Sequence, residues 1–151
     1  AGIALAVYVG DFFQTTGPIR QQKYEDMTLF LYHKVSKWID SALKQDIPDA
    51  VTAFCFNLYD DGTGKWSMEL IGASRFDLED PDWPCDEVTN FMTRETPFRW
   101  RDSAKWDSVL QNMMGVLQNY LQTGEYAALL KSKSGVGIGF VDGDIEILFY
   151  Q

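Results

Sequence analysis

Apolar residues recur at intervals of three and four positions over residues 20–45, which is the spacing of one face of an α-helix. This stripe consists of Tyr24, Met27, Leu31, Val35, Trp38 and Ala42, and Phe30, Ile39 and Leu43 widen it. A second stripe of the same period covers residues 103–122, and Gly124 fits the position just past its end. Asp102 or Ser103 is the expected N-cap of this second helix. Two long amphipathic helices are therefore predicted.

Two further regions alternate between apolar residues and polar or small ones, which is the two-residue period of β-strands. Residues 50–73 contain two such runs joined by the turn-forming residues 60–64, so they predict a hairpin. Residues 135–150 contain two more runs around an Asp-Gly-Asp turn at 142–144. The sequence thus predicts a single α+β domain of residues 1–151, in which an antiparallel sheet built from the two hairpins packs against the two helices.

Three alternating glycines within residues 135–139 leave one face of the second hairpin without side chains. Such a strip allows another element to pack closely, and a helix is the expected occupant. The pattern is not that of a dinucleotide-binding loop, because a strand rather than a helix follows the glycines. A short strand is expected at 98–101 and a short helix at 125–131, whereas residues 3–9 fit either a strand or the start of a helix.

The chain has 22 acidic residues against 13 basic ones, which gives a net charge of −9. This charge repels nucleic acid and anionic membranes, and it attracts basic partners. The longest apolar run, residues 3–9, is too short to cross a bilayer. We therefore expect a protein partner, with no direct contact to nucleic acid or membrane.

Much of the acidic character is concentrated in residues 76–87, where six of twelve positions are carboxylates and none is Lys or Arg. Two prolines disfavour regular structure there, which predicts a stiff, solvated loop. The candidate partner-binding residues are Asp77, Glu79, Asp80, Asp82, Trp83, Asp86 and Glu87. The alternatives are a loop that is merely solvated and a divalent-metal site. Trp83 fits two roles, an anchor that holds the loop to the core or an exposed contact residue of an interface.

Residues that commonly carry catalysis are few in this chain. His33 is the only histidine, and it lies beside the apolar stripe of the first helix, where a surface or partly buried imidazole is expected. Cys85 has carboxylates as neighbours, which do not activate a thiol, so a buried or half-buried structural thiol is expected there. Cys55 lies within a strand and is expected in the core, and both cysteines are expected to be free thiols. The acidic turn at 60–64 lacks the ligand spacing of a calcium loop. No catalytic residue, metal ligand or cofactor is therefore assigned.

Four pieces of the sequence resemble a group of bacterial domains: the strand end at 57–60, the strand around Trp66, the Asp-Trp-Pro-Cys-Asp-Glu segment at 82–87 and the hairpin residues 137–144. Members of this group occur among the immunity proteins of polymorphic toxin and contact-dependent growth inhibition systems. The likeness covers about residues 50–150, and its motifs are structural. It implies a cytoplasmic inhibitor that binds a toxin domain, in many cases a nuclease, and blocks its basic active site with carboxylates in place of phosphates. It implies no catalytic residues.

Two other classes of function remain open from the residues alone. An enzyme that uses carboxylates on a small substrate predicts a deep pocket where two acids converge. A non-catalytic adaptor or scaffold protein predicts acids scattered evenly over the surface. The inhibitor interpretation predicts instead that the acids crowd on one face.

Overall fold

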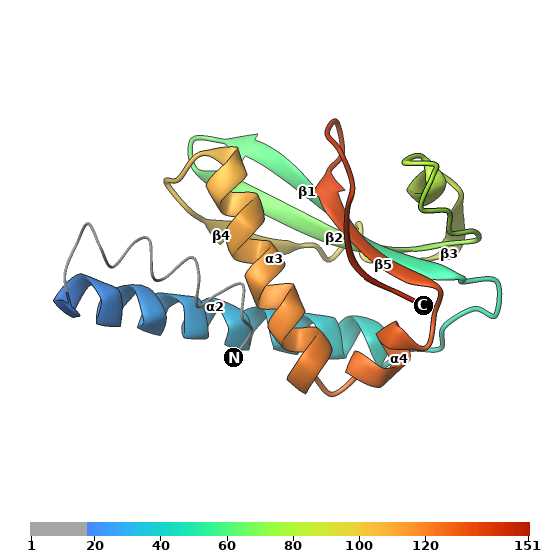
Figure 1. Ribbon diagram of the computed structural model, residues 1–151, viewed down its shortest axis with the longest axis horizontal. Coiled ribbons are helices and arrows are strands. Elements are labelled where there is room, and N and C mark those ends of the chain that lie inside the picture. The colour runs from blue at the N-terminus through green and yellow to red at the C-terminus, as the bar shows by residue number, and fades with distance from the viewer. Residues whose placement is uncertain (1–17) are drawn as a thin grey trace.

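The structure, a computed structural model, describes residues 18–151 of the chain, so the interpretation of residues 3–9 lies outside the described part (Figure 1). Its helices are α2 (Pro18–Leu43), α3 (Trp106–Thr123), α4 (Ala127–Lys131) and the short 3-10 helix η1 (Trp83–Cys85). Its strands are β1 (Ala53–Gly62), β2 (Lys65–Ala73), β3 (Glu87–Met92), β4 (Phe98–Arg101), β5 (Gly135–Phe140) and β6 (Glu146–Tyr150). The expected α+β class, the two long helices and both hairpins are present, as are the short strand and the short helix.

The six strands form one mixed sheet, which corrects the expectation of an antiparallel sheet. The order is β3-β2-β1-β5-β6, and β4 also pairs with β2. Each hairpin is antiparallel, but β1 and β5 lie side by side and run parallel. The long connection through α3 and α4 accounts for this, since a crossover lets the chain re-enter the sheet from the same end. β3 and β4 share the outer edge of β2, with β4 opposite Lys65–Met68 and β3 opposite Ile71–Ala73.

The main core lies between one face of this sheet and the helices (Figure 1). Alternate residues of the central strands, such as Phe54 and Phe56 of β1, are buried against apolar residues of α2 and α3. The stripe of α2 is buried only in its C-terminal half, where Ile39 is fully inaccessible. Met27 is 62 % exposed and Phe30 63 %, because the N-terminal half of the helix extends beyond the sheet (Figure 1).

The ends of α3 differ in detail from the predicted caps. The helix starts at Trp106, and Lys105 is its N-cap without a side-chain hydrogen bond, so the choice of Asp102 or Ser103 was wrong. Asp102 instead accepts a hydrogen bond from the backbone N–H of Ala104 at 2.9 Å, which orders the approach to the helix. Gly124 does follow the helix, but its backbone is extended; a Cβ there would lie 2.5 Å from the ring of Tyr120.

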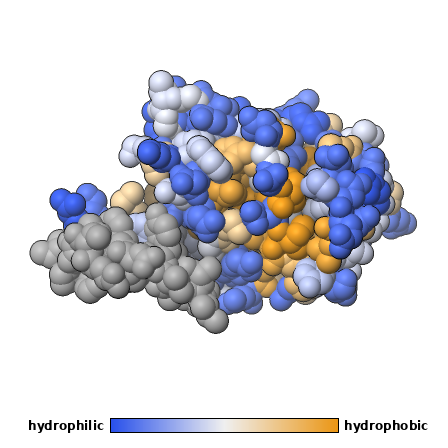
Figure 2. Space-filling model, turned by 45° about the horizontal axis from the view of Figure 1, so that its top comes forward, coloured by the Kyte–Doolittle hydropathy of each residue, from blue (hydrophilic) through white to orange (hydrophobic). Residues whose placement is uncertain are grey.

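No α-helix covers the glycine strip of β5, which corrects that prediction; aromatic side chains cover Gly135 and Gly137, and residues 144–145 cover Gly139. A Cβ on Gly135 would lie 2.1 Å from the ring of Phe76, and one on Gly137 would lie 2.9 Å from Trp83. The α-helices pack on the opposite face of the sheet, and the strip faces the acidic segment 76–87, which includes η1. A second, smaller core forms here, made of Ala53, Cys55, Ile71, Ala73 and Trp83. On the surface drawn in Figure 2, hydrophilic residues surround an apolar area near the middle.

Candidate functional site

The acidic segment 76–87 is an ordered structure held to the sheet by Trp83. This side chain is 1 % exposed, and the ring of Phe76 meets it edge to face at 5.0 Å between ring centroids. The two rings fill the space above Gly135 and Gly137, where any larger residue on β5 would collide with them. The anchor interpretation of Trp83 is therefore confirmed, and the alternative of an exposed contact residue is wrong.

Carboxylates of the segment also fix its backbone. Asp77 accepts a hydrogen bond from the backbone N–H of Glu79 at 2.8 Å, and Asp80 accepts one from that of Asp82 at 2.9 Å. Such bonds from a side chain to the backbone two residues later stabilise tight turns. The single turn η1 then carries Trp83 into the small core. The loop is thus shaped by its own acids as well as by its aromatic anchor.

Two arginines outside the segment pair with three of its six carboxylates. Arg75 binds Asp80 at 2.5 Å and also binds Asp86, and Arg94 binds Glu87 at 2.7 Å. The backbone bond from Asp82 and the guanidinium of Arg75 together lower the pKa of Asp80 below its ordinary value. Each of these three acids therefore has an arginine partner within the folded chain. The sequence analysis missed both arginines because they flank the segment and do not belong to it.

The other three carboxylates face solvent. Asp77, Glu79 and Asp82 are exposed, and within residues 18–151 none of them forms an ion pair. The seven predicted partner-binding residues thus separate into three groups. Asp77, Glu79 and Asp82 offer free charge, Asp80, Asp86 and Glu87 are paired, and Trp83 is buried. We call the three exposed acids on their anchored loop the acidic face.

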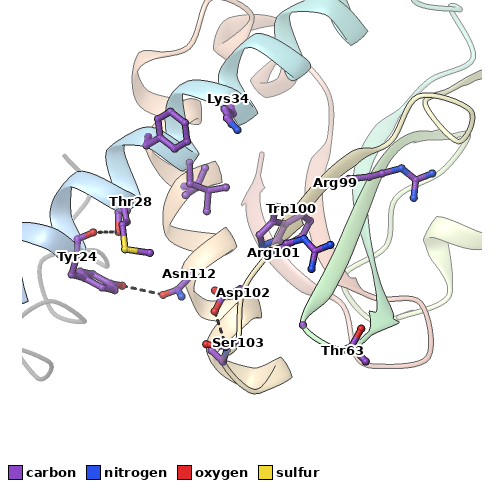
Figure 3. Close-up of a pocket in the computed structure, with 16 residues that line it drawn as sticks. Tyr24, Thr28, Lys34, Thr63, Arg99, Trp100, Arg101, Asp102, Ser103 and Asn112 are labelled. Atoms are coloured by element: carbon purple, nitrogen blue, oxygen red, sulfur yellow. Dashed lines mark hydrogen bonds between the residues drawn. The ribbon is translucent and has the colours of Figure 1, made fainter.

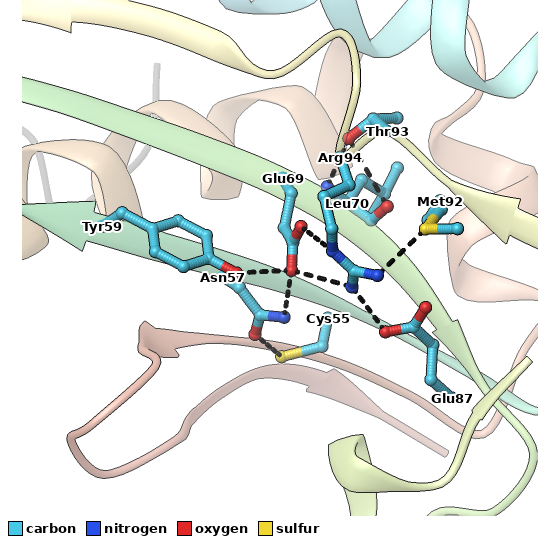
Figure 4. Close-up of polar contacts among 9 residues, drawn as sticks. All are labelled: Cys55, Asn57, Tyr59, Glu69, Leu70, Glu87, Met92, Thr93 and Arg94. Carbon is cyan, nitrogen blue, oxygen red and sulfur yellow. Dashed lines mark hydrogen bonds and ion pairs between the residues drawn. The ribbon is translucent and has the colours of Figure 1, made fainter. Parts of the chain in front are cut away.

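A second cluster of polar residues surrounds Glu69 on β2 (Figure 4). Glu69 is only 2 % exposed, and it accepts hydrogen bonds from Tyr59 at 2.8 Å and from Asn57 at 3.2 Å. Arg94 donates to both of its carboxylate oxygens, at 3.0 and 3.3 Å, and links it to Glu87. A buried carboxylate is tolerated only when its oxygens are satisfied in this way. We call this set the Glu69 network.

Two neighbours of Glu69, Tyr59 and Cys55, hold their protons more tightly than usual. Burial first, and then the hydrogen bond to Glu69, raise the pKa of Tyr59 to about 12. Burial, with a smaller contribution from the charge of Glu69, raises the pKa of Cys55 to about 12, so its thiol stays protonated near neutral pH. Cys55 donates a weak bond to Asn57 at 3.4 Å. The hydrogen bonds from Asn57 and Tyr59 to Glu69 join β1 and β2. The one sign of them in the sequence was Glu69, a charged residue on the face of the predicted hairpin's second strand that does not face the core.

The remaining candidates for chemistry lie apart. His33 is on the exposed side of α2, as expected. Cys85 and Cys55 are both unpaired, as predicted, but Cys85 is exposed, which corrects the expectation of a buried or half-buried thiol. It is exposed because η1 directs the neighbouring Trp83 inward. In the described part of the chain, no group of three or more His, Cys, Asp or Glu side chains is arranged to hold a metal ion.

A pocket of about 900 Å³ opens elsewhere, between α2, α3 and β4 (Figure 3). Its described lining is largely apolar, with Met27, Leu31 and Trp100 among the residues, and Tyr24 donates a hydrogen bond to Asn112 at 3.1 Å beside it. Asp102 is the single carboxylate among the described lining residues. The pocket therefore does not bring together the pair of acids that the enzyme alternative predicts.

Comparison with protein-family models, with curated proteins and with solved structures finds no match to this chain. The described helices include none that is both long and apolar enough to cross a membrane. The acidic face, the Glu69 network and the pocket must therefore be interpreted from their own geometry.

Proposed function

We propose that this protein binds another protein by presenting its acidic face to a basic surface, as an immunity protein does when it neutralises a toxin domain. The observation that carries the proposal is the anchoring of the loop. Asp77, Glu79 and Asp82 project from a backbone that Trp83, buried to 1 % exposure, holds in place. A loop already fixed in its bound shape loses little conformational entropy on association, which leaves more of the interaction energy for affinity.

Charge gives such a protein a way to find its partner quickly. The net charge of −9 attracts a basic surface over a distance, and fixed carboxylates then align with its Lys and Arg side chains. A basic cleft that binds the phosphates of a nucleic acid can accept carboxylates in the same positions, because both groups accept hydrogen bonds from guanidinium groups. A cytoplasmic inhibitor of a nuclease toxin would work in this way.

The paired acids have a different role in this proposal. Asp80, Asp86 and Glu87 are engaged by Arg75 and Arg94, so they shape and orient the loop and do not contact the partner directly. A partner arginine that competed for them would first have to displace an internal one. The charged contacts are therefore assigned to Asp77, Glu79 and Asp82 alone.

A matched pair of triple variants tests the assignment. Asp77→Asn, Glu79→Gln and Asp82→Asn remove the charge of the acidic face. Asp26→Asn, Glu25→Gln and Asp107→Asn remove the same charge from exposed positions on α2 and α3, on the other side of the sheet. The tagged wild-type protein is used at low salt to capture its partner from the native source, and the partner is identified by mass spectrometry.

Association kinetics with that partner are then measured between about 50 mM and about 500 mM salt. We expect the acidic-face variant to associate about tenfold more slowly at low salt, and the difference from wild type to shrink at high salt. The control should slow association only slightly. Equal slowing by both variants would reduce the role of the acids to general charge, and no slowing by either would refute the acidic face as the contact.

A further inference from the structure

Strand β4 forms an open edge of the sheet beside the pocket of about 900 Å³ (Figure 3). Among residues 18–151 it pairs with β2 alone, so the backbone groups on its other side lack strand partners. Residues 99–102 form one wall of the pocket, and α2 forms the facing wall with Met27 and Leu31. An unpaired strand edge thus borders a hollow with apolar side chains on its far side.

The side chains of β4 alternate between apolar and basic. Phe98 and Trp100 lie on the helix side of the sheet, with their rings 5.5 Å apart, and both pack against the main core. Arg99 and Arg101 lie on the opposite face, across from Ser67 and Lys65 of β2, and in Figure 3 they point away from α2. A strand added to this edge would continue both rows, because side chains alternate between the two faces of a sheet.

The basic row carries charge that the described chain does not balance. Lys65, Arg99 and Arg101 are exposed, and none of them forms an ion pair with another residue of 18–151. Lys65 lies directly across from Arg101, and like charges in that position destabilise a sheet. An anionic side chain next to this row would relieve the repulsion. The excess of positive charge is local, since the chain as a whole has a net charge of −9.

We propose that the open edge of β4 binds an extended segment of a partner protein in which acidic and apolar residues alternate. The backbone of the segment pairs with β4 as an additional strand. Its acidic side chains lie beside Arg99 and Arg101, and its apolar side chains enter the pocket between Trp100 and Met27. This site is separate from the acidic face, has the opposite charge, and does not depend on the function proposed above.

The pocket distinguishes the edge of β4 from an edge strand that is only protected against unwanted strand pairing. Charged residues alone commonly guard an edge strand against unwanted pairing. Protection of an edge strand does not require an apolar pocket next to it. Met27 and Phe30 line this pocket on the side of α2, and they are 62 % and 63 % exposed. The volume lies within the range of ligand pockets. The hollow therefore provides room for the apolar row of an added strand.

Two synthetic hexapeptides test the charge requirement. One alternates glutamate with valine, the other alternates glutamine with valine, and both are labelled for fluorescence anisotropy with the 151-residue chain. We expect the glutamate peptide to bind about tenfold more tightly at low salt, since each cross-strand ion pair adds modestly to affinity. Arg99→Gln with Arg101→Gln should remove that preference. Lys37→Gln with Lys44→Gln makes the same change in net charge away from the pocket and should keep it.

Methylated peptides test the strand pairing without any change to the protein. In one version of the glutamate peptide the first, third and fifth backbone nitrogens carry a methyl group, and in the other the second, fourth and sixth. Only alternate amides of an added strand face β4, so one version should lose binding and the other should keep it. Equal affinity of both versions, equal loss in both, or no preference for glutamate over glutamine would overturn the proposal.

Discussion

The acidic face and the Glu69 network use the same chemical groups in opposite ways. In the loop, Arg75 pairs with two carboxylates and Arg94 with a third, and the other three are exposed without an ion pair to any residue of 18–151. In the network, Glu69 is buried on β2, and both of its carboxylate oxygens accept hydrogen bonds, from Tyr59, Asn57 and Arg94. The first arrangement leaves charge for another molecule, and the second uses its charge to join strands. Burial of the carboxylate, more than its number of arginine partners, separates the two roles.

The largest effect on stability is expected from removal of Trp83, the anchor that holds the acidic face in its shape. Trp83→Ala empties a site that is 1 % exposed between Phe76 and the glycine strip. We expect the free energy of unfolding to fall by about 3–5 kcal/mol, the usual cost of such a truncation in a core. Urea denaturation measures this loss.

Trp106→Ala is the matched control for the anchor. This tryptophan is 60 % exposed on α3, so its truncation should cost less than about 1 kcal/mol. If the two variants lost equal stability, the segment 76–87 would not be held to the sheet as described.

The next largest effect is expected in the Glu69 network. Arg94→Met leaves the carboxylate of Glu69 buried without its cationic partner, and the expected loss is about 2–3 kcal/mol, typical of a hydrogen bond to a charged group. Arg75→Met removes an arginine whose ion pairs are exposed and should cost much less. Urea denaturation of both variants, side by side, measures the contrast between the two clusters.

A double variant sharpens this test. Adding Glu69→Gln to Arg94→Met makes the buried group neutral, so part of the lost stability should return. If Arg75→Met were as damaging as Arg94→Met, or if the double variant were no more stable than Arg94→Met alone, burial would not be what separates the two clusters.

Local patterns in the sequence predicted the helices and hairpins, because each depends on the spacing of residues that are close along the chain. The parallel contact of β1 with β5 could not be predicted in this way, since it joins Phe54 to Val136 across most of the domain. The same limit explains the error about the glycine strip. The alternating glycines indicated that another part of the chain packs closely on the strip, but they did not say which part, and only the fold brings Trp83 to it.

The sequence singled out the acidic segment as a whole, but it could not divide the residues of the segment by environment. Its six carboxylates look alike in the sequence, and the separation of Asp77, Glu79 and Asp82 from the others depends on which acids Arg75 and Arg94 reach. Arg75 directly precedes the segment, so it could have been considered. Arg94 lies beyond the next strand, and its pairing with Glu69 is a tertiary contact.

The smallest expected effect concerns the pH dependence of the paired acids. Asp80 has a pKa below its ordinary value of 3.8, first because of the backbone N–H of Asp82 and then because of Arg75. A carboxyl whose pKa is lower in the folded state stabilises the fold above its unfolded pKa, and this contribution is lost as the pH falls through the folded pKa. The stability difference between wild type and Asp80→Asn should thus be constant near neutral pH and narrow below about pH 4. Asp61→Asn, at an exposed turn position, is the matched control. Urea denaturation across this range measures both, and a difference for Asp80→Asn that stayed constant in acid would mean that its carboxylate is not held by Arg75 and the turn.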